Sequence, residues 1–473
     1  MWGRAGADTR SGVTTVRVVY EHGTLVVPAL PPEAEPLRGL LREDGRTGRL
    51  RAPGSAYRAL LLGLRRLDVE VVDEARRFDP LTLALDPSIN PFPHQAEALS
   101  AWRAAGRAGV VEMPTGSGKT LLGAMAIAET GRPALVVVPT IELLHQWRGV
   151  LARALGREVG VIGGGEKDRR EVTVITYDSA AMQAEFLGDR FGLLVFDECH
   201  HLPSEAYRFV AEAAIAPFRL GLSATLARPD GKEVEVHRLV GPLVHRVGVE
   251  ALEGDYLSPY TVETVPVSLD AEEAELYEAS RERYLRFLRG QGLDYRRPGW
   301  WGEFVARAHR SEEGKEAFAA YRTQRRIALS SRAKLDALWA ILVRHAEDRV
   351  LVFAEDNETV YRVARRFLLP ALTHRTRPAE RRALLEGFSS GTLRVLVTAK
   401  VLNEGVDVPE ANVGVVLSGS GSVREHVQRL GRILRKRAGK RAVLYEVVSD
   451  VAAEAGISER RRQHEAYGRA EPC

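Results

Sequence analysis

The segment GVVEMPTGSGKTLLGAMAIAET, residues 109–130, places a glycine-rich loop between a short apolar run and an apolar stretch of helical spacing. A phosphate-binding loop requires this order of strand, loop and helix. Its glycines let peptide N–H groups curl around a phosphate, and the helix N-terminus adds positive charge. The segment therefore predicts a nucleotide site at the end of a strand.

Short apolar runs alternate with helical patterns in two successive series. The first comprises GVVEM, ALVVVP, VTVITY, LLVFDE and FRLGLSA, and the second RVLVFAE, RVLVTA, NVGVVLS and AVLYEVV. Such alternation is typical of parallel, doubly wound sheets. The chain has 473 residues, which is too long for one ordinary core, so we expect two to four domains. The predicted class is α/β with two such sheets.

The regions outside these series have other patterns. From about Val16 to Phe78, VRVVY and TLVV flank EHG as a hairpin, and a helical segment precedes the strand-like DVEVV, which predicts a small α+β module. A Pro- and Asp-rich linker follows. From about Tyr256 to Ser331 the segments are helical, arginine-rich and aromatic, which predicts a helical insertion at the start of the second sheet.

Composition limits the class of protein. The chain is 45% hydrophobic and 27% charged, has no run of about 18 apolar residues, and begins without the apolar centre of a signal peptide. We therefore expect a cytoplasmic protein without a membrane partner. Its two cysteines, Cys199 and Cys473, exclude a disulfide framework and a four-cysteine zinc site. The net charge of +4 permits a nucleic-acid partner without demonstrating one.

Six consecutive residues of the loop are candidate nucleotide ligands. Lys119 is expected to reach the β and γ phosphates, and Thr120 to offer its hydroxyl to Mg²⁺. The first glycine of the general pattern is replaced by Met113. The nucleotide-binding set is Thr115, Gly116, Ser117, Gly118, Lys119 and Thr120.

Two acids, Asp197 and Glu198, end the apolar strand LLVF, and we expect them one sheet position from the phosphate loop. Asp197 is predicted to hold Mg²⁺ through water, and Glu198 to orient and deprotonate the attacking water. The alternative of a metal site at Cys199, His200 and His201 is weaker, because consecutive residues on an extended chain point to opposite faces. A buried thiol is the favoured interpretation of Cys199.

Polar residues after other strands are candidates for coupling and for DNA contact. Ser223 and Thr225 in GLSAT, together with His200, are expected to couple nucleotide state to the neighbouring domain. Thr140 and Thr176 lie at strand ends, where hydroxyl and N–H groups can grip a sugar-phosphate backbone.

The second series carries a further set of motifs. VTAKVLNEGVDVP contains Thr398 and Asp407, assigned here to nucleic acid and to nucleotide. VQRLGRILR contains Gln428, Arg432 and Arg435. The two arginines have the spacing of arginine fingers that reach a γ-phosphate, and Gln428 is expected to contact the nucleotide or the attacking water.

The helical insertion leaves two interpretations open. Its aromatic residues Tyr277, Tyr284 and Phe287 recur at helical spacing, which suits packing as well as base stacking. The pair Trp300-Trp301 suits a stacking surface or a cover over the core. Four arginines favour phosphate contacts: Arg281, Arg283, Arg286 and Arg289.

In this order the motifs resemble those of a superfamily 2 helicase. IAPFRLGLSAT, FDECHHLP, ANVGVVLSGSGS, QRLGRILR and LYEVVSD further resemble the XPB family of DNA repair helicases, above all its archaeal and bacterial members, from about Val16 to Tyr467. The resemblance implies DNA-dependent ATP hydrolysis with Mg²⁺ and 3′ to 5′ translocation or unwinding. It also implies a structure-specific nuclease as partner, and we expect a monomer apart from that partner.

The resemblance implies an N-terminal module likened to damage-recognition domains, two RecA-like motor domains and a thumb-like insertion. The expected boundaries are a flexible N-terminus at 1–15, the α+β module at 16–80, motor domain 1 at 81–250, the thumb-like helical insertion at 251–331, motor domain 2 at 332–455 and a C-terminal tail at 456–473.

Two departures from the family pattern concern strand separation and nucleotide choice. The Arg-Glu-Asp element falls at Arg228, Pro229 and Asp230, so its central acid is missing. The entry that helps to read adenine is Phe92-Pro93-His94-Gln95, in which Gln95 still matches.

Three alternatives to a strand-separating helicase are left open. The chain is also compatible with an ATP-switched DNA-binding scaffold that positions a nuclease, and with a double-strand translocase that does not separate strands. An RNA helicase is disfavoured by the lack of an Asp-Glu-Ala-Asp box.

Overall fold

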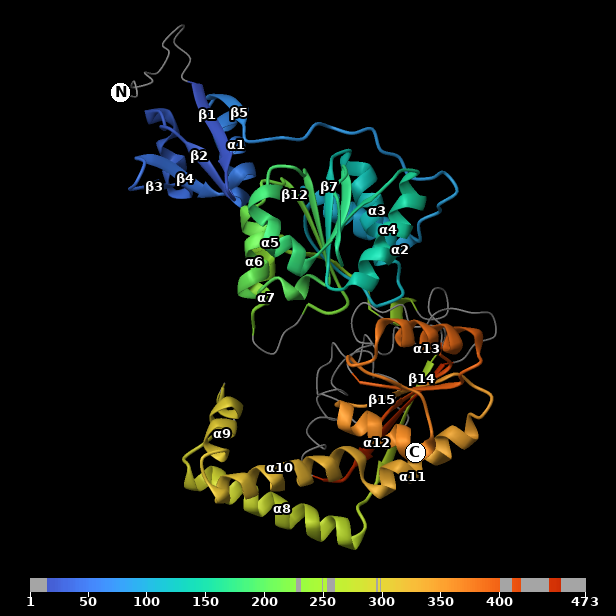
Figure 1. The fold of residues 1–473 in the computed structure, drawn as a ribbon. Helices are drawn as coiled ribbons and strands as arrows, with labels where there is room; N and C mark the ends of the chain where they lie inside the picture. Colours follow the sequence, from blue (N-terminus) through green and yellow to red (C-terminus); the bar gives the residue numbers. More distant parts are fainter. Residues whose placement is uncertain are drawn as a thin grey trace. The chain divides into compact units, whose positions relative to one another are not determined.

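The computed structural model describes residues 15–226, 231–248, 250–252, 260–294, 297, 299–399, 411–417 and 442–451. It divides into two compact units, Met1–Val247 and Gly248–Cys473 (Figure 1). Among the described residues, no helix is both long enough and apolar enough to cross a membrane.

The first unit begins with a five-stranded mixed sheet in the order β3-β4-β2-β1-β5. Strands β1 (Thr15–Glu21) and β2 (Thr24–Val27) form the predicted hairpin, and β5 (Glu70–Glu74) runs parallel to β1. Helix α1 (Tyr57–Arg66) lies between β4 (Arg49–Pro53) and β5 in sequence, and β3 (Arg42–Asp44) is the far edge. Apolar side chains from β1, β2 and α1 share one buried core.

An eight-stranded sheet follows in the order β13-β6-β12-β11-β7-β10-β8-β9. All neighbouring strands are parallel except β8 and β9. The strands are β6 (Ala108–Glu112), β7 (Ala134–Val138), β8 (Gly160–Gly163), β9 (Glu166–Asp168), β10 (Val172–Thr176), β11 (Leu193–Asp197), β12 (Phe218–Ser223) and β13 (Leu243–Arg246). The first predicted α/β sheet is therefore confirmed.

Helices cover both faces of this sheet (Figure 1). On one side lie α2 (Pro93–Ala104), α3 (Lys119–Thr130) and α4 (Ile141–Leu155), and on the other α5 (Tyr177–Leu187), α6 (Glu205–Ala213) and α7 (Glu233–Leu239). Because parallel strands are buried on both faces, β7, β10 and β11 read as continuous apolar runs, and every residue of these three strands is buried.

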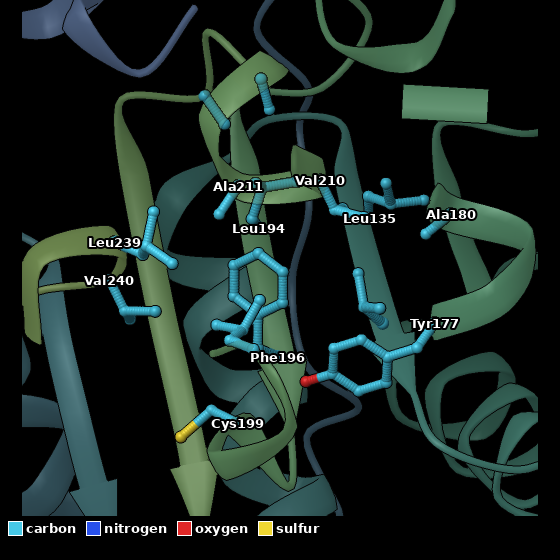
Figure 2. Packing of buried hydrophobic residues seen from close by; sticks show 14 of the residues in the cluster. Leu135, Tyr177, Ala180, Leu194, Phe196, Cys199, Val210, Ala211, Leu239 and Val240 are labelled. Atoms are coloured by element: carbon cyan, nitrogen blue, oxygen red, sulfur yellow. The ribbon is translucent and has the colours of Figure 1, made fainter. Parts of the chain in front are cut away.

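The core beneath α5, α6 and α7 contains Phe196 and Cys199 (Figure 2). Cys199 is fully buried, and a side chain at Gly221 would meet its sulfur at 3.1 Å. Burial raises the pKa of the Cys199 thiol well above its ordinary value. The interpretation of Cys199 as a buried thiol is confirmed.

The second unit contains a six-stranded parallel sheet in the order β14-β19-β18-β15-β17-β16. Its strands are β14 (Tyr260–Val267), β15 (Val350–Phe353), β16 (Ala371–Leu372), β17 (Val395–Thr398), β18 (Val413–Val416) and β19 (Ala442–Ser449). Helices α11 (Arg332–Arg344), α12 (Asn357–Phe367) and α13 (Pro378–Ser390) belong to the same unit. The second predicted sheet is thus also confirmed.

Three helices form a bundle within the segment expected to be a thumb-like insertion, and we call it the thumb-like bundle. The long helices α8 (Ala271–Gly290) and α10 (Glu312–Ser330) run side by side, and α9 (Trp300–Ala308) packs at their far end (Figure 1). Tyr277, Tyr284 and Phe287 are buried, so packing is the confirmed one of their two interpretations.

The prediction that the whole segment 251–331 is helical is wrong. Tyr260–Val267 forms β14, which pairs with β19 along its full length at the edge of the second sheet. The sequence YTVETVPV is rich in β-branched residues, which favour a pleated strand. Pro266 is compatible with this place because an edge strand leaves one row of N–H groups unpaired.

Candidate nucleotide site

The phosphate loop lies between β6 and α3. Gly116 and Gly118 both have a φ of +87°, in the left-handed region that favours glycine. α3 begins at Lys119, so its first N–H groups have no intrahelical acceptor and face the loop. Thr120 is the second residue of this helix and is partly exposed. The order of strand, loop and helix is therefore as predicted, and the binding of phosphate by this loop stays a prediction.

Gln95 of α2 lies behind this loop. Its Nε2 donates to the carbonyl oxygens of Ser117 at 3.2 Å and Gly118 at 3.3 Å, and its Oε1 accepts from the N–H of Phe92 at 3.0 Å. A Cβ at Gly118 would lie 2.1 Å from this Nε2. His94 Nε2 also contacts the Ser117 carbonyl oxygen at 2.9 Å. Because Gln95 is fully buried, it braces the loop here, and its contact with adenine stays a prediction.

Lys119 and Glu198 meet directly. Lys119 Nζ donates to Glu198 Oε1 at 3.2 Å, although 79 residues separate them in sequence, and both side chains are about nine-tenths buried. Burial alone would raise the pKa of Glu198, but the Lys119 cation and the neighbouring His200 outweigh it and hold that pKa below its usual range. Glu198 therefore stays ionised at neutral pH.

Asp197 has the opposite electrostatic surroundings. Burial and the negative charge of Glu198 raise its pKa above its ordinary value. Trp147 Nε1 donates to its Oδ2 at 2.7 Å, and the Glu198 N–H donates to its Oδ1 at 3.0 Å. The Tyr177 hydroxyl donates to the Asp197 carbonyl oxygen at 3.0 Å. The carboxylate is thus held in one orientation.

Trp147 and Tyr177 are site residues that sequence reasoning missed. Leu144, Trp147 and Leu151 share one face of α4 and are fully buried, so their spacing signals core packing alone. Trp147 also packs against α3, where a side chain at Gly123 would lie 2.5 Å from its ring. Nothing in the local pattern marks its indole N–H as the donor to an acid 50 residues away.

Two buried oxygen atoms in the site make no hydrogen bond with the described residues: Glu198 Oε2 and Thr115 Oγ1. Buried polar atoms without a hydrogen bond are uncommon, and the ionic neighbour of Glu198 Oε2 is His200 Nδ1 at 3.4 Å. Glu198 is also one of the few non-glycine residues at positive φ, +47°, and such strain gathers at functional sites. The loop N–H groups and Lys119 suit the phosphates of a nucleoside triphosphate, and the two acids suit its metal ion and the attacking water.

His200 joins the acid pair to the end of β12. Its Nδ1 lies 3.4 Å from Glu198 Oε2 and 3.2 Å from Ser223 Oγ. Ser223 Oγ donates to the Thr225 carbonyl oxygen at 2.9 Å and accepts from the Thr225 N–H at 3.2 Å. The three residues predicted to couple nucleotide state to motion therefore form one continuous network that begins at Glu198.

Two geometric expectations at this site are wrong. β12 lies between β6 and β11, so the acids are two sheet positions from the loop rather than one. Cys199–His201 is a short 3₁₀ helix, in which the His200 and His201 rings are 4.4 Å apart rather than on opposite faces. Even so, no group of three or more His, Cys, Asp or Glu side chains among the described residues suits a metal ion.

Glu112, the last residue of β6, is a further link that sequence reasoning missed. Its Oε2 accepts from the Leu226 N–H at 2.8 Å, and its Oε1 lies 2.9 Å from Arg246 Nε. It therefore fastens the segment after Ser223 to the strand that leads into the phosphate loop.

The remaining predicted residues have other surroundings. Thr140 and Thr176 cap α4 and α5, accepting from the N–H groups of Leu143 and Ser179. Thr398 is fully buried and donates to the Ala399 carbonyl oxygen at 3.2 Å. Their contacts with DNA stay predictions. Six predicted residues lie outside the described ones: Arg228, Asp230, Asp407, Gln428, Arg432 and Arg435.

Family models match three parts of the chain. The damage recognition domain of the xeroderma pigmentosum group B helicase matches residues 18–75, the res subunit of type III restriction enzymes matches 88–228, and the helicase conserved C-terminal domain matches 333–437. The DNA 3′-5′ translocase XPB2 of Sulfurisphaera tokodaii is 40% identical over 414 residues, which is 86% of this chain and 94% of that protein. The chain belongs to the XPB family of superfamily 2 helicases.

Further comparisons agree with XPB membership. The DNA 3′-5′ helicase XPB of Mycobacterium tuberculosis is 31% identical over 76% of this chain and 61% of its own length. Among solved structures, the Hef helicase domain of Pyrococcus furiosus aligns with a TM-score of 0.52 at 20% identity, covering 78% of this chain and 98% of that domain. This likeness supports the fold of two RecA-like domains.

Proposed function

We propose that this XPB family member is a DNA-dependent ATPase that moves 3′ to 5′ along DNA and opens duplex during repair. The observation that carries the proposal is the contact of Lys119 with Glu198 beside the phosphate loop, continued through His200 to Ser223. Family membership supports the DNA substrate, and the donor set supports ATP.

ATP binding would exchange the partner of Lys119. The ammonium group leaves Glu198 for the β and γ phosphates, which carry more negative charge than one carboxylate. Glu198 Oε1 is then available for a water molecule. It accepts a proton while the water oxygen attacks the γ phosphorus, and the bond to the bridging oxygen breaks to release ADP and phosphate.

Thr120 and Asp197 are the residues that would hold Mg²⁺. Both oxygens of Asp197 already accept hydrogen bonds, which supports contact through water, and the ion would offset negative charge on the phosphates. Gln428, Arg432, Arg435 and Asp407 remain proposed nucleotide contacts from the second motor domain.

The network from Glu198 to Thr225 would report the state of the γ phosphate. When Glu198 changes partner, His200 loses or gains a negative neighbour at 3.4 Å. The hydrogen bond between His200 and Ser223 would transmit this change in charge to Ser223. Thr140, Thr176, Thr398, Arg228 and Asp230 remain proposed contacts with DNA, and a structure-specific nuclease remains the proposed partner.

The test is phosphate release with and without forked DNA by wild-type chain, Lys119→Ala and Glu198→Gln. We expect both variants to lose DNA-stimulated release while keeping their circular dichroism spectra. Undiminished turnover in both would overturn the proposal. Strand displacement compared with triplex displacement then separates duplex opening from translocation on duplex DNA.

A further inference from the structure

A cavity of about 560 Å³ lies within the second unit, outside the sites assigned above. Its wall combines aromatic side chains of α9 and α10 with arginines of α10 and α12. A volume of this size suits a small organic ligand or one nucleotide.

Helical spacing brings the lining residues together. On α10, Tyr321 and Arg325 are four residues apart, as are Arg322 and Arg326, so the aromatic and cationic parts of the wall follow one another along one helix face. One helical turn, about 5.4 Å, separates the two parts. Arg362 comes from the facing helix α12.

The four arginines of the cavity differ in whether a carboxylate forms an ion pair with them. Arg322 lies 3.3 Å from Glu358, and Arg325 lies 2.9 Å from Glu355 and 3.5 Å from Asp356. For Arg326 and Arg362, no carboxylate lies within ion-pair distance among the described residues.

The two unneutralised arginines also repel each other. Burial lowers the pKa of Arg362, and the nearby Arg326 cation lowers it further. Two guanidinium groups that line one cavity, and that no described carboxylate approaches within ion-pair distance, form a site that an anion would stabilise, because each offers several N–H donors in a planar fork.

The aromatic part of the wall is open to solvent. Trp301 is 40% exposed, and its ring centroid lies 4.9 Å from that of Tyr321 and 5.6 Å from that of Trp300. Neighbouring rings hold the indole in place and leave area uncovered. A flat heteroaromatic base suits such a surface.

We propose that this cavity binds one unstacked nucleotide of a single DNA strand, with its base against Trp301 and its phosphate between Arg326 and Arg362. The proposal rests on the proposed function and adds a base-binding subsite within the thumb-like bundle. A phosphorylated peptide would satisfy the arginines but offers no base for the exposed indole.

The test compares the full chain with variants in binding a labelled 15-nucleotide single strand and the same strand with abasic positions, by fluorescence anisotropy over a salt series. Wild-type chain should prefer the strand with bases. Trp301→Ala should reduce that preference at least about fivefold, and Trp301→Phe should restore most of it because the ring is kept.

Arg326→Gln/Arg362→Gln should leave the base preference in place and lower the salt slope by about 0.7, since the two arginines hold one phosphate and each phosphate contact on a single strand contributes about 0.7. The matched control is Arg365→Gln/Arg366→Gln, which removes the same charge from exposed positions of α12 and should keep the wild-type slope. Thermal melts followed by circular dichroism verify folding.

Three outcomes would overturn the subsite. These are equal binding of both strands by the wild-type chain, an unchanged preference in Trp301→Ala, and equal slopes in the two double variants. Displacement of the DNA by a phosphotyrosine peptide but not by a thymidine oligonucleotide would also overturn it, in favour of a protein partner. The proposed function fails separately, through absence of DNA-stimulated ATP hydrolysis in the wild-type chain.

Discussion

The nucleotide site of the first unit and the thumb-like bundle of the second unit use charge in different ways. In the first, the buried carboxylate of Glu198 contacts both Lys119 and His200. In the second, most arginines lie on the surface in ion pairs such as Arg286 with Glu282. Buried charges depend on their partners, whereas exposed pairs contribute little to stability. The first arrangement suits a switch, and the second a surface that a ligand can reorganise.

The largest expected effect tests whether the buried pair is the catalytic switch. Glu198→Gln should lower DNA-stimulated phosphate release by about 100-fold or more, because general-base catalysis contributes roughly 10²–10⁴. Lys119→Ala should also lower the melting temperature, since it leaves Glu198 buried without its cation. Adding Glu198→Gln to Lys119→Ala should restore most of that melting temperature. A double variant no more stable than Lys119→Ala would mean that the pair does not govern stability.

The next effect concerns Trp147, which supports Asp197. Trp147→Ala should destabilise the chain by about 3–5 kcal/mol, in the range for large aromatic residues removed from a core. Urea unfolding followed by circular dichroism measures this change. Trp147→Phe keeps most of the packing but removes the donor, so it isolates the hydrogen bond. A loss of under about 1 kcal/mol in Trp147→Ala would contradict the packing seen at Gly123.

Trp147→Phe also makes a prediction about pH. The indole N–H stabilises the Asp197 carboxylate, so its loss should raise further a pKa that is already raised. Protonation of Asp197 removes the charge proposed to hold Mg²⁺, so activity falls as pH drops through that pKa. The acid limb of the ATPase profile should therefore move to higher pH in Trp147→Phe. A limb at the wild-type pH would show that Asp197 does not control it.

A smaller effect tests coupling. Ser223→Ala removes the hydroxyl that links His200 to Thr225 while leaving Lys119 and Glu198 in place. Stimulation by DNA should fall about fivefold or more, the low end of typical coupling free energies, with little change in hydrolysis without DNA. Steady-state phosphate release at saturating ATP measures both rates. Equal losses in the two rates would indicate a purely structural role.

The smallest expected effect concerns an exposed ion pair of the thumb-like bundle. Arg286 and Glu282 form an exposed i,i+4 pair on α8 at 2.7 Å. Arg286→Gln should change the free energy of unfolding by less than about 0.5 kcal/mol, because solvent screens the pair. A urea titration beside the Trp147 variants makes the comparison. A loss above about 1 kcal/mol would mean that the surface charges of the bundle are more strongly coupled than their exposure indicates.

The features that could be predicted from sequence are those that depend on residues close together in the chain. The phosphate loop, the acids after β11 and the order of strands and helices all depend on residues close together in the chain, and these predictions match the fold. The network of His200, Ser223 and Thr225 was also accessible, because each residue follows a strand of one sheet.

Long-range packing accounts for the rest. The partners of Asp197 and Glu112 lie 50 and 114 residues away, and no local pattern records such pairs. The β-branched pattern of β14 is visible locally, but its place at the edge of the second sheet depends on β19, whose paired residues lie 182 positions further on. The cavity of the second unit depends on three helices, and its unneutralised arginines are recognisable only once Glu355, Asp356 and Glu358 are seen to pair with others.

The hydrogen bond between Trp147 and Asp197 also has an optical consequence. The emission of a buried indole shifts with the charge beside it, and here that charge belongs to the acid proposed to meet Mg²⁺. Under the proposed function, Trp147 would therefore be an intrinsic fluorophore whose emission changes when the metal and nucleotide bind beside Asp197. The chain has six tryptophans, so replacing the other five with phenylalanine would give a single-tryptophan reporter of the catalytic cycle.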